Sequence, residues 1–457
     1  MRRTIATMLL LAWGAPSAAV LAADHSQAAS GWQQVAKYHV GDADDEAAAP
    51  AAAVGTGAGG AQLSAASYYD AYAASAAAYA ASTNAAAAAT RSTAPGADVS
   101  CSQGACSTCN NNCGCGDCHV NAFRAEYLLW FTRGRNVPPL VSNGPLDGTG
   151  DVLYGDDPVG TDLRSGGRLT FNHLFADGAT WGDIRFWGLE DSSETFFTSS
   201  SGDPGSPVIG RPFNNVLTGP DFLIVAQSGV AASGSIRVLS KNDLIGGDAW
   251  FRQAWSDDGC TRIDLLAGYM FTRLDDSVTI NSVATNVIPN DPSFGTIFDV
   301  TDSFRTENEF HGGQIGILAT RRGCGPVGLE VLAKIALGDM RQAVTIDGSQ
   351  TQTSVGGGVV VNQSGLLAQP TNIGTYERHR FAVVPELNVN LVYDVNPCWR
   401  LMAGYSFIYW SNVVLAGNQI DTTVDPSQLG TSTRPAFDFT RTDYWAQGLS
   451  LGAEYRW

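Results

Sequence analysis

The sequence predicts an all-β fold: a transmembrane, antiparallel, up-and-down β-barrel of about ten strands, within a range of eight to twelve, behind a mostly disordered N-terminal extension. Apolar residues recur at every second position in a series of segments between residues 121 and 457, and short and long connections alternate between these segments. After residue 23, no run of about 18 apolar residues remains for a spanning helix. A chain that crosses a bilayer without such helices does so as a closed barrel.

Residues 1–23 have the three parts of a secretory signal peptide. Arg2 and Arg3 precede an apolar run that starts at Ile5, and small residues end at Ala22 and Ala23, where we expect cleavage. The two arginines leave open export by the route for folded proteins, although the rest of that motif is missing.

The segments before the barrel differ in composition. Residues 24–100 are of low complexity and Ala-rich, with too little large apolar surface for a core, so we expect a periplasmic tether. Residues 101–119 form a Cys-rich segment, with six cysteines between Cys101 and Cys118. Disulfides within or between chains, a bound metal and free thiols all stay open for it, and an oxidising periplasm favours disulfides.

The barrel is predicted over residues 120–457. In its first strand, Phe123, Ala125 and Tyr127 alternate with the charged Arg124 and Glu126. The predicted strands are 123–131, 167–176, 180–190, 244–255, 263–271, 309–320, 329–337, 380–393, 401–409 and 449–457. Their even number brings both ends of the barrel to the same side of the membrane.

The connections alternate in length. Short turns are predicted at 177–178, 257–260, 321–326 and 394–398, and Cys260, Cys324 and Cys398 lie in three of them. Long loops rich in Gly, Asp, Ser, Thr and Pro are predicted at 133–165, 191–235, 274–306, 339–376 and 411–442. This alternation is typical of outer-membrane barrels, whose turns face the periplasm and whose loops face the outside.

A soluble β-sandwich would show similar alternation. The two folds can be distinguished by the charged residues at the strand positions between the apolar ones. A confined lumen requires balanced charge, because an unpaired buried charge is costly, whereas a sheet that faces water does not. Seven cations and seven anions fall opposite the apolar phase. They are Arg124, Arg185, Arg252, Arg262, Lys334, Arg400 and Arg456, against Glu126, Asp183, Asp248, Asp264, Glu330, Glu386 and Glu454.

Aromatic residues gather near both ends of the predicted strands. On the loop side they are Trp130, Phe131, Tyr269, Phe271, Tyr409, Trp410 and Trp445, and on the turn side Trp181, Trp255, Tyr393, Trp399, Tyr455 and Trp457. Two such girdles are typical of a lipid-facing band. The last strand, which ends at Trp457, also looks like the signal read by the barrel assembly machinery.

Several short motifs carry a family resemblance. They are Ala125–Trp130, Leu265–Tyr269, Phe310–Gly316, Gly365–Asn372, Tyr409–Asn412 and Tyr444–Gly448. Taken together, they resemble the large family of predicted outer-membrane β-barrel proteins of planctomycete-type bacteria. The resemblance implies location and fold, and it carries no reaction, ligand or catalytic residue to this chain.

Features of catalysis and of nucleic-acid binding are missing. The net charge is −17 and the chain has only three lysines, which argues against a nucleic-acid partner. We find no nucleophile elbow, phosphate loop or metal-binding helix, and so predict no catalytic, cofactor-binding or metal-ligating residue and no cofactor. His311 and His379, beside Glu309 and Glu377, leave open a barrel-embedded hydrolase with its site at the outer rim. Satisfied polar rim residues are the favoured interpretation.

We therefore expect an integral outer-membrane protein of a Gram-negative cell envelope, with a structural, surface-anchoring or narrow-pore role and no catalysis. A small-solute channel is the alternative, but open aqueous channels belong to barrels of about sixteen strands or more, so a lumen lined by balanced charges should be largely plugged. The expected partners are outer-membrane lipid, the barrel assembly machinery through the strand ending at Trp457, and other copies of this chain through Cys101 to Cys118.

Overall fold

The computed structural model describes residues 38–39, 120–322, 325–427 and 433–457. The signal peptide predicted at 1–23 and the Cys-rich segment predicted at 101–119 lie outside the described residues. So does the tether predicted at 24–100, apart from Tyr38 and His39. Among the described residues, no helix is long and apolar enough to cross a membrane.

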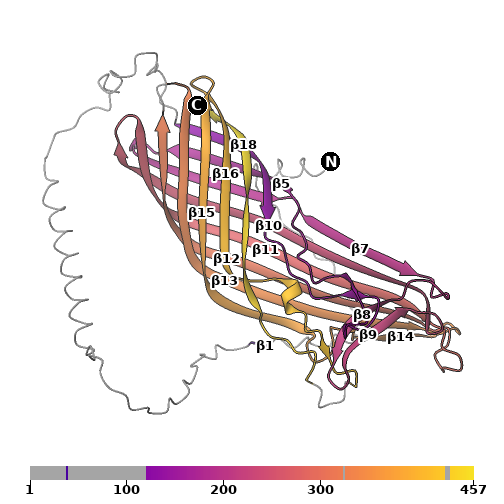
Figure 1. The fold of residues 1–457 in the computed structure, drawn as a ribbon. Coiled ribbons are helices and arrows are strands. Elements are labelled where there is room, and N and C mark those ends of the chain that lie inside the picture. The colour runs from indigo at the N-terminus through magenta and orange to yellow at the C-terminus, as the bar shows by residue number, and fades with distance from the viewer. Residues whose placement is uncertain (1–37, 40–119, 323–324, 428–432) are drawn as a thin grey trace, which may run out of the picture. The chain divides into compact units, whose positions relative to one another are not determined.

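Ten strands of the described residues form a closed antiparallel ring (Figure 1). They are β2 (Asn121–Thr132), β5 (Arg164–Leu174), β6 (Thr180–Leu189), β10 (Ala231–Asp257), β11 (Thr261–Asn286), β12 (Ile297–Arg322), β13 (Val327–Thr353), β15 (Gly374–Asp394), β16 (Trp399–Val414) and β18 (Arg441–Arg456). Each pairs with the next in chain order, and β18 pairs with β2 to close the ring. Every predicted strand overlaps one of these ten, so the predicted barrel is confirmed.

One end of the barrel carries the short turns, and we call it the turn end. The barrel's first and last strands also meet there, because the backbone N–H of Asn121 donates to the carbonyl oxygen of Trp457 at 3.0 Å. In three of the turns the side chain of Asp177, Asp258 or Asn396 accepts the backbone N–H groups two and three positions further on. Such Asx turns explain why strands end at these residues.

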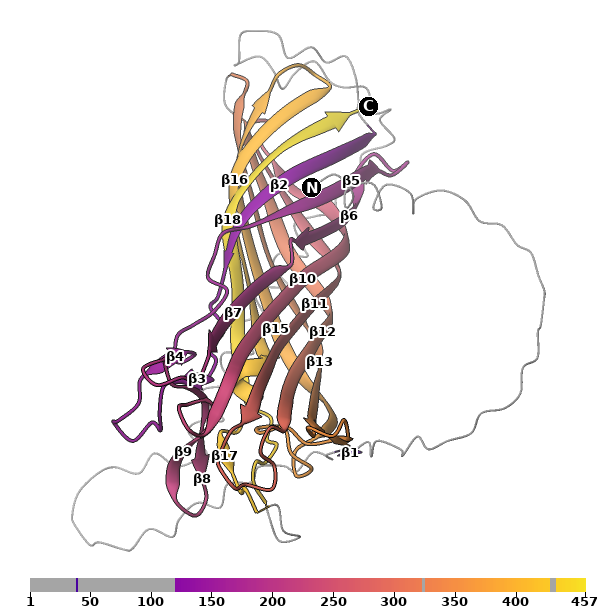
Figure 2. The same cartoon turned by 90° about the vertical axis from the view of Figure 1, so that its right-hand side faces the viewer.

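The opposite end, the loop end, carries several shorter elements (Figure 2). β7 (Ser192–Ser200) follows β6 and pairs with the part of β10 nearest the loop end. A second small sheet contains β3 (Val141–Ser142), β4 (Val152–Tyr154), β8 (Ile209–Asn215), β9 (Gly219–Ala226) and β17 (Thr423–Val424). β14 (Val359–Asn362) pairs with β13, β1 (Tyr38–His39) pairs with β15, and the single-turn helix η1 spans Ala416–Gln419.

The prediction of long loops at 191–235, 274–306 and 339–376 is wrong over most of each range, because β7, β8, β9, β14 and the extensions of β10 to β13 and β15 occupy them. β10 to β13 run for 26 or 27 residues each. In these extensions the inner face carries buried apolar side chains, among them Val278, Ile280 and Phe304, while Thr279 and Thr301 on the outer face are polar. Because the outward residues of these extensions are mostly polar, their overall composition is that of a loop. Inward and outward residues nevertheless still alternate.

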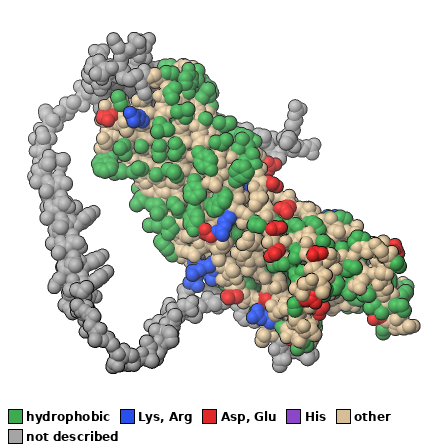
Figure 3. All heavy atoms as spheres, in the orientation of Figure 1, with side chains coloured by type: hydrophobic (Ala, Val, Ile, Leu, Met, Phe, Trp, Pro, Cys, Tyr) green, Lys and Arg blue, Asp and Glu red, His purple; other side chains and the backbone are tan. Residues whose placement is uncertain are grey.

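The outer surface is divided into an apolar band and a polar extension. On β13, every second residue from Leu329 to Leu337 is apolar and faces outward, and Asp339 and Arg341 follow. Figure 3 shows this band on the part of the barrel toward the turn end, with charged side chains beyond it. A tilted strand needs about 9–11 residues to cross a bilayer, so the band has the height of a membrane and the extension lies outside it.

The two predicted aromatic girdles are partly correct. Phe131 and Tyr269 are exposed on the outer face toward the loop end, as are Trp255 and Trp399 near the turn end. Three of the predicted girdle residues instead point inward. Trp130 and Trp410 are only 3% and 1% exposed, and Trp181 pairs with Arg252, whose guanidinium lies inside the barrel 4.8 Å from the indole centroid. Adjacent residues of a strand face opposite sides, so nearness to a strand end does not fix the face.

Candidate functional site

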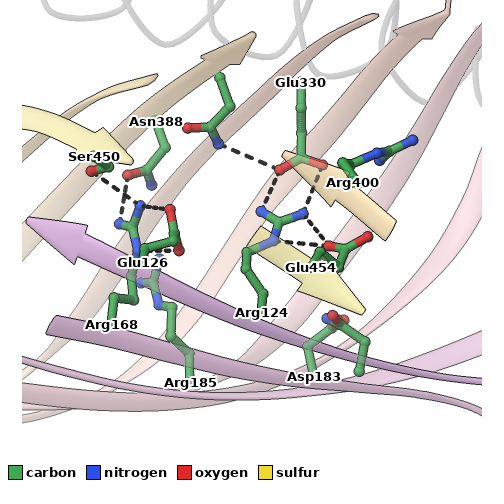
Figure 4. A network of polar contacts seen from close by, with 12 residues as sticks. Arg124, Glu126, Arg168, Asp183, Arg185, Glu330, Asn388, Arg400, Ser450 and Glu454 are labelled. Carbon is green, nitrogen blue, oxygen red and sulfur yellow. Dashed lines mark hydrogen bonds and ion pairs between the residues drawn. The ribbon is translucent and has the colours of Figure 1, made fainter. Parts of the chain in front are cut away.

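The interior of the barrel contains the charged side chains that the sequence placed opposite the apolar phase. Many of them form two clusters between the turn end and the middle of the barrel, and Figure 4 shows some members of each. The turn-side cluster consists of Arg124, Asp183, Arg252, Asp264, Glu330 and Glu454. The middle cluster consists of Glu126, Arg168, Arg185, Asp248, Lys334 and Glu386. The prediction that these charges face a lumen is confirmed.

The turn-side cluster joins opposite walls of the barrel. Arg124 Nη1 on β2 donates to Glu330 Oε1 on β13 at 2.7 Å, and Arg124 Nη2 donates to Glu454 Oε2 on β18 at 2.7 Å. Because β18, β16 and β15 separate β2 from β13 in the ring, the contact with Glu330 crosses the interior. Arg252 on β10 instead links carboxylates of its two neighbouring strands, Asp183 on β6 and Asp264 on β11, each at 2.9 Å.

The middle cluster also crosses the lumen and is neutral, with three cations and three anions. Arg185 on β6 donates two hydrogen bonds to Asp248 on β10, both at 2.8 Å, and two to Glu386 on β15, both at 2.7 Å. Lys334 contacts the same two carboxylates, and its side chain is fully buried. Buried charges of this kind are stable only when each has its partner, which the cluster provides.

The sequence did not identify Arg168 as a lumen residue. Its guanidinium donates to Glu126 at 2.6 and 2.7 Å and to Asn388 Oδ1 at 3.0 Å (Figure 4). Arg168 follows Gly166 and Gly167, so its strand lacks clear alternation at that point.

An apolar layer fills the barrel on the loop side of the middle cluster. It includes Leu128, Trp130, Trp187, Leu244, Met270, Phe310, Met340, Trp410 and Tyr444, all almost fully buried. The ring of Trp187 lies 5.7 Å from that of Trp130 and 6.2 Å from that of Trp410. Trp410 Nε1 donates to Thr272 Oγ1 at 2.8 Å, which fixes its indole. Near-zero exposure of these side chains means that no water-filled channel passes them.

Two interior carboxylates hold loops in the loop end of the lumen. Asp302 on β12 accepts the backbone N–H groups of Leu367 at 2.9 Å and Ala368 at 2.6 Å, and it also pairs with Arg211 of β8. Asp276 on β11 accepts the N–H of Ala416 in η1 at 2.9 Å. The segments around β8, residues 365–368 and η1 are therefore folded into the mouth.

The mouth also has a locally positive region. Arg378 Nε on β15 donates to Gln342 Oε1 at 2.6 Å, and its guanidinium lies 4.1 Å from the ring centroid of Phe439. Burial, with repulsion from Arg380 and Arg441, lowers the pKa of Arg378 to about 10.

His311 and His379 lie on the outer face, just beyond the apolar band. His379 Nδ1 contacts Asp339 Oδ2 at 2.6 Å, and His311 contacts the hydroxyl of Tyr269. Glu309 and Glu377, the carboxylates beside them in sequence, are both paired with Arg341. Among residues 120–322, 325–427 and 433–457, no group of three His, Cys, Asp or Glu side chains is arranged to hold a metal ion.

Comparison with protein families decides the classification. The model of the putative beta barrel porin-7 family matches residues 123–457. This chain belongs to that family. Membership in the beta barrel porin-7 family, together with the apolar band, identifies the chain as an outer-membrane β-barrel protein and confirms that part of the resemblance. The planctomycete origin stays an expectation.

Solved structures give distant matches. The outer membrane protease OmpT from Escherichia coli matches at 9% identity and a TM-score of 0.37, over 74% of this chain and 97% of that chain. The outer membrane channel DcaP of Acinetobacter baumannii matches at 9% identity and a TM-score of 0.17, over 74% and 96%. The anion-selective porin from Comamonas acidovorans matches at 8% identity and a TM-score of 0.16, over 73% and 100%. No curated protein matches the sequence.

Proposed function

We propose that this porin-family barrel has a structural, surface-anchoring or narrow-pore role, with a lumen closed to ordinary solutes and no catalytic activity. The closure of the lumen is the observation that carries the proposal. The apolar layer around Trp187 and Trp410 lies directly against the neutral middle cluster, and both are almost fully buried. A solute would have to break buried ion pairs and displace packed indoles, each of which costs several kcal/mol.

Swelling of proteoliposomes in isotonic arabinose tests the closure. The wild-type protein should give no swelling above that of empty liposomes, whereas the double variant Trp187→Ala/Trp410→Ala should admit the sugar, because it removes two indoles from the layer. The matched control is Phe131→Ala/Tyr269→Ala, which removes aromatic rings of the lipid-facing surface. Swelling by the wild-type protein at the rate of an open porin would refute the closed lumen.

A small-solute channel is the second candidate, and the family's description as a porin favours it. In that case the loops in the mouth would have to move, and the contacts of Asp276 and Asp302 would control them. The double variant Asp276→Asn/Asp302→Asn should then increase the entry of arabinose, while a structural barrel should show no change because the apolar layer still closes it.

The proposal includes an orientation. Residues 1–23 direct export, the turn end faces the periplasm, and the loop end faces the outside. The support is that both ends of the barrel meet at the turn end and that the long connections lie at the other. A membrane-impermeant maleimide should label Ser354→Cys on intact cells and leave the exposed thiol of Cys260, in a turn-end hairpin, unlabelled. The opposite pattern on peptide mapping would invert the orientation.

A further inference from the structure

A cavity of about 330 Å³ lies in the mouth of the barrel, on the inner face of the extension and away from the ion-pair clusters. Three adjacent strands supply one wall. Val300 on β12 is paired directly with Ser282 on β11 and with Gln350 on β13, so these three side chains form a row across the sheet. Ala284 and Phe298 form the next row toward the loop end.

The other wall comes from elements folded into the mouth. It includes Leu223 and Val225 of β9 and Leu366 of the connection between β14 and β15. The contacts of Asp302 hold this wall in place, because its carboxylate pairs with the buried Arg211 of β8 and accepts the N–H groups of residues 366–368. The cavity therefore has a fixed shape before any ligand enters, as small-molecule sites usually do.

The lining is apolar with a few hydrogen-bonding groups and, among the described residues, no charged side chain. Gln350 is half-buried, and its side-chain amide makes no hydrogen bond within the described part of the chain. Ser282 donates one long bond of 3.5 Å to the carbonyl oxygen of Val300, so its oxygen can still accept. Gln350 and Ser282 flank the same apolar residue, and one polar group of a ligand can reach either of them.

We propose that this cavity binds an uncharged, mainly apolar small molecule that carries one hydrogen-bonding group, such as a hydroxyl. The volume lies at the small end of the range of about 300–1,000 Å³ for ligand sites, which limits the ligand to one or two fused rings or an equivalent chain. The absence of a charged group in the described lining disfavours a carboxylate or an amine, because an unpaired ion is costly to bury. This function goes beyond the barrel role, since the site opens to the mouth and needs no passage through the lumen.

Equilibrium dialysis of 2-naphthol against the full-length protein in phospholipid nanodiscs tests the proposal, with empty nanodiscs measuring partition into lipid. We expect saturable binding of one molecule per barrel above that background. Ala284→Trp should weaken binding at least tenfold because its indole fills the cavity. Val283→Trp is the matched control on the outer face of the same strand and should bind as the wild type does.

Two further comparisons test the chemistry of the site. Gln350→Leu should weaken 2-naphthol binding roughly fivefold to tenfold, the value of one hydrogen bond, and leave naphthalene unaffected. 2-Naphthoate should bind at least tenfold more weakly than 2-naphthol. Val300→Phe serves as a second filling variant if Ala284→Trp lacks the heat-modifiable mobility of a folded barrel. Binding no greater than that of empty nanodiscs, wild-type affinity in a folded filling variant, or tighter binding of 2-naphthoate would each overturn the proposal.

Discussion

Replacement of Arg185 by methionine should strongly destabilise the barrel. The guanidinium is 4% exposed and donates four hydrogen bonds, to Asp248 and Glu386, whose side chains are 1% and 4% exposed. Methionine fills a similar space but leaves Lys334 as the one cation still paired with the two buried carboxylates. Removing one partner of a buried ion pair costs about 3–5 kcal/mol, and we expect a loss of that size.

Urea unfolding of the protein in phospholipid vesicles, followed by tryptophan fluorescence, measures this loss. Arg305→Met is the matched control, because Arg305 lies 3.8 Å from Asp347 with both side chains more than half exposed, and such surface pairs contribute about 0–1 kcal/mol. Arg185→Met/Glu386→Gln restores the charge balance of the cluster and should regain more than half of the loss. If Arg185→Met costs no more than Arg305→Met, the middle cluster does not hold the walls together.

Three other predictions concern parts of the chain outside the lumen. Burial, with repulsion from Asp191 and Asp275, raises the pKa of Asp243. The folded state therefore loses stability as pH rises from the unfolded value of about 3.9 through the raised pKa. Asp243→Asn should raise the urea midpoint at pH 7, with a gain that shrinks toward pH 4; an equal gain at both pH values would refute this. Trp457→Asp should stop insertion but not export, whereas Trp457→Phe should insert; heat-modifiable Trp457→Asp barrels in membrane fractions would count against a role of this strand in assembly. Disulfides through Cys101–Cys118 should give oligomers of the full-length protein that reductant dissolves, and oligomers indifferent to reductant would rule out this cross-linking.

The membrane-spanning part of the fold could be predicted because lipid imposes a simple pattern on it. From Leu329 to Leu337 every second residue is apolar and faces hydrocarbon, and the inward positions between them include the charged Glu330 and Lys334. Beyond the membrane the outer face of the same strand meets water, so its outward residues are mostly polar. Only inward residues such as the buried Val344 still indicate the strand. The extension was therefore interpreted as loop, although its strands stay paired from β10 to β13, with one register shift between Ala232 and Ser235 of β10.

The candidate site was predictable in its charges but not in its closure. An unpaired buried charge is costly, so the lumen should contain equal numbers of cations and anions. These residues can be counted in the sequence. The apolar layer depends on Trp130 and Trp410 facing inward and on Trp187 lying between them. The first depends on the register of each strand, and the second on contacts between residues far apart in sequence. The loops held by Asp302 are likewise non-local, because residues 366–368 show no pattern that identifies their partner.

Single-channel conductance of the purified wild-type protein in a planar lipid bilayer tests the closed lumen most directly. The account predicts no steady openings in 1 M KCl, because the buried layer around Trp187 and Trp410 leaves no continuous path for hydrated ions. The variant Trp187→Ala/Trp410→Ala, recorded under the same conditions, should open and so show that barrels are inserted. Steady openings of about a nanosiemens in the wild-type protein, the scale of a wide aqueous pore, would contradict the account.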